Sequence, residues 1–137
     1  MNKFEILDLV ADSYNPLILL IALVLSLRAI HEKKIVKALR NIGMLLVTII
    51  PVYALMLIDK KVEIWLSMGL DYSTHTALAA VITMYIAKET RFALQIFTST
   101  ALYIGLMLYQ EYHTLLDIVS TLVVIVPITM MINKFSK

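Results

Sequence analysis

The sequence predicts an all-α integral membrane protein that folds as one helical bundle. Of its 137 residues, 61% are hydrophobic, and the mean hydropathy is +0.86, which is more apolar surface than a water-soluble fold of this size can bury. The apolar residues gather in five stretches with short polar connections between them. Glycine and proline occur only three times each, so no flexible linker marks a boundary. We expect a single transmembrane domain over residues 1–137.

Each of the five stretches is interpreted as a transmembrane helix. A spanning helix needs about 20 apolar residues, because hydrocarbon offers no hydrogen-bond partner to an exposed backbone. The third stretch is short for a span. Asn15 is expected to cap the first helix, with Pro16 at its first helical position. The expected helices cover residues 16–30, 42–58, 74–87, 92–108 and 113–132.

The stretch before Pro16 is expected to form a separate amphipathic helix on the membrane surface. Its sequence, KFEILDLVADSY, places Glu5, Asp8 and Asp12 at helical spacing among apolar residues. The stretch is acidic rather than basic, and no small-residue cleavage site follows the first apolar run. A cleavable signal peptide is therefore not expected.

The basic residues predict the orientation, because lysine and arginine are retained on the cytoplasmic side of short loops. The connection between the first two helices, RAIHEKKIVKALR, is rich in both, and others flank the third turn and the C-terminus. The opposite side has only Lys3, Lys60 and Lys61. We expect the N-terminus outside and the C-terminus in the cytoplasm, in a membrane such as the bacterial inner membrane.

Two similar stretches place histidines at the outer ends of apolar helices. They are DYSTHTALAAV at 71–81 and EYHTLLDIVS at 111–120. His113 and Asp117 are four residues apart and are expected on one helix face, with Asp117 inside hydrocarbon and His113 as its partner. A hydrogen bond to one imidazole nitrogen would leave the other free to attack, to take a proton or to bind a metal.

The start of the third helix is a candidate anion site. Ser73, Thr74 and Thr76 surround His75 where free backbone N–H groups and the helix dipole favour negative charge. Two histidines, a carboxylate and a helix N-terminus at one membrane face suit phosphoryl transfer. One histidine would attack phosphorus and the other would protonate the leaving oxygen. The segment that contains Trp65 is expected to fold over this site.

The STHT and HTLLD motifs resemble the Ser-Gly-His-Thr and His-x-x-x-Asp elements of the type 2 phosphatidic acid phosphatase superfamily, the membrane lipid phosphate phosphatases. The resemblance covers residues 57–121, with the elements in the same order. It implies that His113 is the nucleophile that forms a phosphohistidine, that Asp117 orients it and that His75 is the general acid. It requires no metal or other cofactor.

The same resemblance leaves the substrate and the cations open. Sphingomyelin-synthase-like phosphotransferases have a similar His, His, Asp constellation, so hydrolysis of a lipid phosphate or pyrophosphate and lipid phosphotransfer are both compatible. The arginines of the family elements have no counterpart on the outer face of this chain. Lys60 and Lys61, together with Ser73, Thr74 and Thr76, are the expected phosphate-binding residues.

The expected partners are a lipid phosphate substrate and membrane lipids, and a homo-oligomer is compatible with the sequence. A net charge of +2 does not predict nucleic-acid binding. The absence of cysteine excludes thiolate metal sites and thiol catalysis. Two alternatives remain: a catalytically degenerate member of the family, or a non-enzymatic protein. The latter would be an assembly subunit or a cation-binding or transport component using His75, His113, Asp117 and Glu111.

Overall fold

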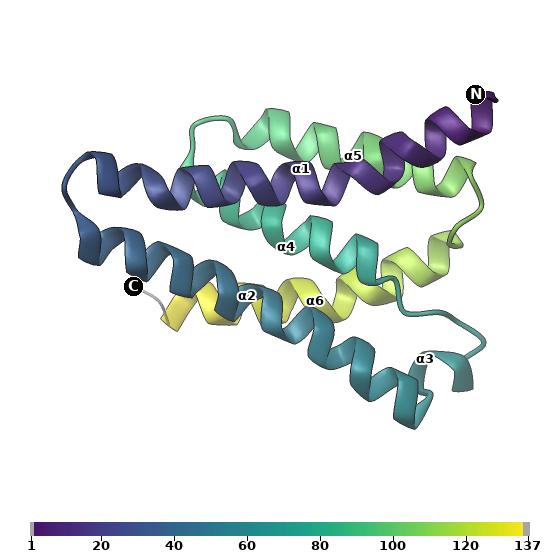
Figure 1. Ribbon diagram of the computed structural model, residues 1–137. Helices are drawn as coiled ribbons and strands as arrows, with labels where there is room; N and C mark the ends of the chain where they lie inside the picture. The colour runs from purple at the N-terminus through teal and green to yellow at the C-terminus, as the bar shows by residue number, and fades with distance from the viewer. Residues whose placement is uncertain (1, 136–137) are drawn as a thin grey trace.

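The computed structural model describes residues 2–135, and within them every regular element is a helix (Figure 1). This confirms the all-α prediction. Five helices are long and one, α3, is a single turn. The helices are α1 (Lys3–His31), α2 (Ile35–Val62), α3 (Ile64–Ser67), α4 (Thr74–Glu89), α5 (Ala93–Tyr109) and α6 (Leu115–Phe135).

Helix α4 is the central element of the bundle. Helices α1, α2, α5 and α6 all pack against it, and Figure 1 shows it between them. Small side chains such as Ala77 and Ala79 are fully buried along it, which lets neighbouring backbones approach closely. Its 16 residues correspond to about 24 Å, which is shorter than the hydrocarbon layer.

Two apolar clusters hold the other helices to α4. One joins α1, α2 and α5 through residues such as Ile18, Leu45 and Met107. The other joins α2, α3 and α6 and includes Trp65 and Ile125. The second cluster fixes the short helix α3 against the end of the bundle.

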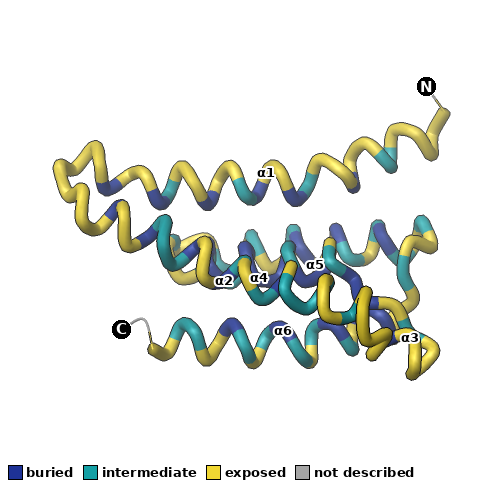
Figure 2. The backbone as a smooth tube through the Cα atoms, turned by 60° about the horizontal axis from the view of Figure 1, so that its bottom comes forward, coloured by how far each residue is buried: buried dark blue, intermediate teal, exposed yellow. Residues whose placement is uncertain are grey.

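The outer surface of the bundle is apolar along most of its length. Figure 2 shows exposed residues along the outward sides of the helices, and many of them are large hydrophobic side chains. Helices α1, α2 and α6 are long and apolar enough to cross a membrane, and α5 is a shorter apolar helix. These features support a membrane protein, while the five-span arrangement stays a prediction.

The prediction of a separate surface helix before Pro16 is wrong. Helix α1 is continuous from Lys3 to His31 and contains Pro16 in its interior. Asn15, expected to cap the first helix, is only 6% exposed. Its amide nitrogen donates to the carbonyl of His75 at 3.2 Å and to the hydroxyl of Tyr103 at 3.4 Å. Packing against α4 and α5 thus keeps this region helical, since neighbouring helices make an internal proline tolerable.

The two ends of the bundle differ in charge. One end carries the N-terminus and the α2–α4 and α5–α6 connections, and we call it the site end (Figure 1). The other end carries the α1–α2 and α4–α5 connections and the end of α6, and we call it the basic end. Of the lysines and arginines in residues 2–135, only Lys3, Lys60 and Lys61 belong to the site end, which holds most of the acidic residues.

Candidate functional site

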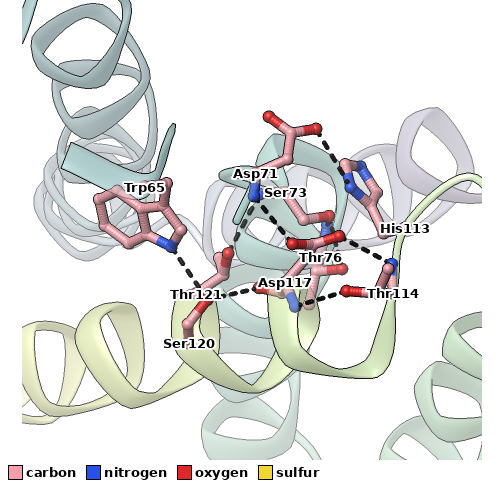
Figure 3. Close-up of polar contacts among 9 residues, drawn as sticks. All are labelled: Trp65, Asp71, Ser73, Thr76, His113, Thr114, Asp117, Ser120 and Thr121. Carbon is pink, nitrogen blue, oxygen red and sulfur yellow. Dashed lines mark hydrogen bonds and ion pairs between the residues drawn. The ribbon is translucent and has the colours of Figure 1, made fainter. Parts of the chain in front are cut away.

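The two histidine-containing stretches, far apart in the sequence, lie against each other at the site end (Figure 3). The backbone N–H of Asp71 donates to Oδ1 of Asp117 at 2.8 Å. The backbone N–H of Ser73 donates to Oγ1 of Thr121 at 3.0 Å. These bonds join the segment before α4 to the first turns of α6.

Asp117 acts as a capping residue of α6. Its side chain is 6% exposed, and Oδ2 accepts a bond of 2.8 Å from the backbone N–H of Thr114. In return, Oγ1 of Thr114 accepts from the backbone N–H of Asp117 at 3.2 Å. This is the reciprocal pattern of a capping box. A carboxylate in the first turn also interacts favourably with the helix dipole.

The expected hydrogen bond between His113 and Asp117 is wrong. Helix α6 begins at Leu115, so His113 lies before the helix and the four-residue spacing does not place the two side chains on one face. Both oxygens of Asp117 accept from backbone N–H groups instead. The prediction that Asp117 faces the bundle interior is confirmed by its burial.

His113 lies beside a different carboxylate. Its side chain is 13% exposed, and Nδ1 is 3.4 Å from Oδ2 of Asp71. Within residues 2–135 this nitrogen has no aligned hydrogen-bond partner, so the contact is an ion-pair distance rather than a hydrogen bond. The Asp71 side chain is 73% exposed. Figure 3 shows the carboxylate and the imidazole facing each other.

The N-terminus of α4 is divided into buried and accessible residues. Ser73 caps the helix, because its Oγ accepts from the backbone N–H of Thr76 at 3.3 Å. The same hydroxyl donates to Oγ1 of Thr76 at 2.8 Å, and both residues are fully buried. Of the residues expected to bind phosphate here, Thr74 is the accessible one, and the neighbouring His75 is exposed.

The structure does not join the two histidines. Among the described residues, no hydrogen bond or ion pair connects the side chain of His75 with His113 or Asp117, and the carbonyl of His75 accepts from Asn15. Within residues 2–135, His75 and His113 therefore share the site end but no hydrogen bond or ion pair.

The segment containing Trp65 folds onto the site end, as expected. The backbone N–H of Trp65 donates to Oδ1 of Asp59 at 2.8 Å, and its indole N–H donates to Oγ of Ser120 at 3.0 Å. The ring packs edge-on against Tyr72 at 4.9 Å between centroids. Burial, with a smaller contribution from Asp59, raises the pKa of Tyr72 to about 12.

Lys60 and Lys61 occupy the last turn of α2 and are both exposed. They follow Asp59, which is linked to Ser120 of α6 through Trp65. The two lysines are thus attached to the same end of the bundle, although no hydrogen bond or ion pair joins them to the described residues of the site.

Sequence reasoning missed the parts played by Asp71 and Thr114. The sequence marks Asp71 only as the start of a motif, because its proximity to His113 depends on tertiary packing. Thr114 could have been found, because Thr-Leu-Leu-Asp before an apolar run has the pattern of a capping box. That pattern also predicts that the helix begins after His113.

Within residues 2–135, no group of three or more His, Asp and Glu side chains could hold a metal ion. No protein-family model matches the chain, and no curated protein or solved structure matches it either.

Proposed function

We propose that the protein is a membrane-embedded lipid phosphatase or phosphotransferase whose reactive residue is His113. The observation that supports this most is the convergence of the two motif stretches, which are tied by the bonds from Asp71 to Asp117 and from Ser73 to Thr121. These stretches are the ones that resemble elements of the type 2 phosphatidic acid phosphatases. Their order and their meeting at one end of a membrane bundle agree with that resemblance.

In the proposed mechanism, Asp71 rather than Asp117 orients the nucleophile. A carboxylate facing Nδ1 of His113 favours the tautomer with the proton on that nitrogen, so Nε2 keeps its lone pair. Nε2 forms the bond to phosphorus while the bond from phosphorus to the lipid oxygen breaks, and His75 gives that oxygen a proton. Water, or the hydroxyl of a second lipid, then takes the phosphoryl group from His113.

Asp117 has a positioning part in this mechanism. Its two hydrogen bonds fix the backbone of Asp71 and Thr114. Asp71 lies next to the imidazole of His113 in space, and Thr114 follows His113 in the sequence. Loss of its carboxylate would let both backbones move. Because a misplacement of about 1 Å can lower a rate by roughly a hundredfold, its removal would affect the reaction without any contact with substrate.

Few residues near the site could neutralise the negative charge of a phosphate group. Phosphoryl transfer depends on positioning and on stabilising negative charge. The accessible groups for this are Lys60, Lys61 and the N-terminal backbone of α4 around Thr74. Lysine lacks the bidentate geometry of arginine, so phosphate would be held less rigidly than by an arginine pair.

A specific observation supports a second candidate function, that of a non-catalytic protein related to the phosphatases that the motifs resemble. Asp117, Ser73 and Thr76 use their polar atoms to hold the chain together. In addition, acidic residues predominate at the site end, which disfavours an anionic substrate. In this alternative the motif residues stabilise the fold, and the site end serves as an assembly or cation-binding surface.

Phosphate release from lipid phosphates distinguishes the two candidates. Purified protein, in the presence of a strong chelator, should release phosphate from phosphatidic acid or an isoprenyl pyrophosphate, or transfer it between lipids. His113→Ala should abolish this activity. His31→Ala is the matched control, because His31 is exposed at the opposite end of the bundle, and it should retain the parent rate.

Two results would contradict the proposal. If the parent protein is inert on each of these lipids and forms no acid-labile phosphohistidine, the non-catalytic alternative holds. If activity disappears on chelation and returns with zinc, the reaction depends on a metal rather than on a histidine nucleophile.

A further inference from the structure

Helices α1 and α5 lie alongside each other in Figure 1, and residues of both helices line two neighbouring cavities, which we together call the furrow. The two cavities have volumes of about 600 Å³ and 750 Å³, and both are lined by Gln95 and Ser99. The first extends toward the site end as far as Leu106, and the second reaches Arg91 at the basic end. From the start of α5 to Leu106 the furrow extends about 20 Å, the scale of a lipid chain in one leaflet.

The lining of the furrow changes from apolar to charged along its length. Its walls in the helical region combine aliphatic and aromatic side chains with the polar Gln95, Thr98 and Ser99. Its mouth at the basic end is lined by Arg28, Glu89 and Arg91. The aliphatic residues are Val10, Ile21, Leu25, Ile86, Leu94, Ile96, Leu102 and Leu106. An amphipathic ligand fits this lining, with its apolar chain along the walls and its polar headgroup at the charged mouth.

Both arginines at the mouth are available to a ligand. The Arg28 side chain is 75% exposed, and its Nε lies 4.0 Å from the carboxylate of Glu32. That carboxylate is closer to Nζ of Lys34, at 3.1 Å. The Arg91 guanidinium lies 5.2 Å from the centroid of the Phe92 ring, and Arg91 is exposed. Glu89 is the acidic residue in the same lining.

We propose that the furrow binds an anionic phospholipid from the surrounding bilayer, with its acyl chains along the aliphatic walls and its phosphate between Arg28 and Arg91. Arginine binds phosphate through paired hydrogen bonds, and basic pockets between membrane helices hold anionic headgroups. Lys37 lines an adjoining cavity of about 120 Å³ together with Arg28, Glu32 and Glu89, where two cations face two carboxylates, so the proposed phosphate site depends on Arg28 and Arg91. This site lies at the opposite end of the bundle from His113 and does not depend on the proposed reaction.

Lipid titration of the purified full chain tests the proposal. In detergent, phosphatidylglycerol should bind more tightly than zwitterionic phosphatidylcholine, as measured by native mass spectrometry and by the rise in unfolding temperature. Arg28→Gln and Arg91→Gln should each weaken phosphatidylglycerol binding by about fivefold, the equivalent of ~1 kcal/mol for one cation near an anionic headgroup. Arg40→Gln is the control, because Arg40 is an exposed arginine at the same end that lines a different cavity.

A second variant separates binding in the furrow from general attraction to a basic surface. Gln95 is exposed and lines both cavities, so Gln95→Trp should obstruct the furrow and weaken binding of phosphatidylglycerol with no change in charge. Equal affinity for the two lipids would overturn the proposal. So would an Arg40→Gln effect as large as that of Arg91→Gln, or unchanged binding in Gln95→Trp.

Discussion

Oδ1 of Asp117 accepts a hydrogen bond of 2.8 Å from the backbone N–H of Asp71, so one buried carboxylate joins the start of α6 to the segment before α4. Its other oxygen caps α6 through Thr114. Asp117 therefore acts first on the fold, and Asp71 is the carboxylate that faces His113. The sequence motif assigns Asp117 the orienting role toward His113, whereas in the structure Asp117 accepts from backbone N–H groups and Asp71 is the carboxylate beside the imidazole.

Replacing Asp117 with asparagine should destabilise the protein. The amide has one acceptor oxygen, so its NH₂ group would face one of the two backbone N–H donors, from Asp71 or Thr114. A buried donor without a partner costs about 1–3 kcal/mol, and the free energy of unfolding in detergent should fall by this amount. Glu111→Gln, an exposed acid in the same connection, should change little. Parent-like stability of Asp117→Asn would show that these two hydrogen bonds do not stabilise the fold.

Replacing Asp71 with asparagine should reduce activity more than stability. The bond that Asp71 donates to Asp117 uses its backbone N–H, and its side chain is largely exposed. Turnover of lipid phosphate should fall by tenfold or more, or about 1.4 kcal/mol of transition-state stabilisation, with an unchanged unfolding temperature. Glu63→Gln provides an exposed acidic control at the same end. A parent-like rate in Asp71→Asn would remove Asp71 from the mechanism.

The lysines at the end of α2 should supply the cations that phosphate needs. At least one of Lys60→Ala and Lys61→Ala is expected to lower turnover by an order of magnitude, while the matching change to arginine keeps or raises it. Lys33→Ala, at the basic end, is the control. If the double alanine variant turns over lipid phosphate at the parent rate, the backbone around Thr74 would have to carry the neutralisation alone.

The contact between Trp65 and Ser120 should be visible in fluorescence. Trp65 is the single tryptophan of the chain and is 4% exposed, so its emission reports the position of α3. Ser120→Ala leaves the indole N–H without its acceptor and should increase quenching by acrylamide. Ser67→Ala should not, because the Ser67 hydroxyl bonds only the carbonyl of Ile64 within its own helix. Equal quenching in the parent and Ser120→Ala would show that this bond does not hold α3.

The sequence predicted two helices to within two residues at each end, whereas α2 (Ile35–Val62) extends well beyond the expected 42–58. The expected third helix, 74–87, compares with Thr74–Glu89, and the expected fourth, 92–108, with Ala93–Tyr109. At Asn15 and Pro16 the local start signals were outweighed by tertiary contacts with α4 and α5, which no local pattern encodes.

The site was harder to predict because it depends on helix boundaries to within one turn. His113 and Asp117 share a face only if the helix includes both residues, and α6 begins two residues after His113. The proximity of Asp71 to His113 arises from packing of the segment before α4 on α6. Convergence of the two stretches at one end was nevertheless predictable, since alternating helices return the chain to the same side.

The orientation of the bundle can be tested directly, because the chain contains no cysteine. Lys61 and Lys34 are both exposed and lie at opposite ends. If the basic end faces the cytoplasm, Lys61→Cys should react with a membrane-impermeant thiol reagent in intact cells and Lys34→Cys should react only after permeabilisation. Labelling of Lys34→Cys alone in intact cells would show that the orientation is the reverse of the predicted one. The His113 site would then face the cytoplasm, and the phospholipid furrow would open toward the outer leaflet.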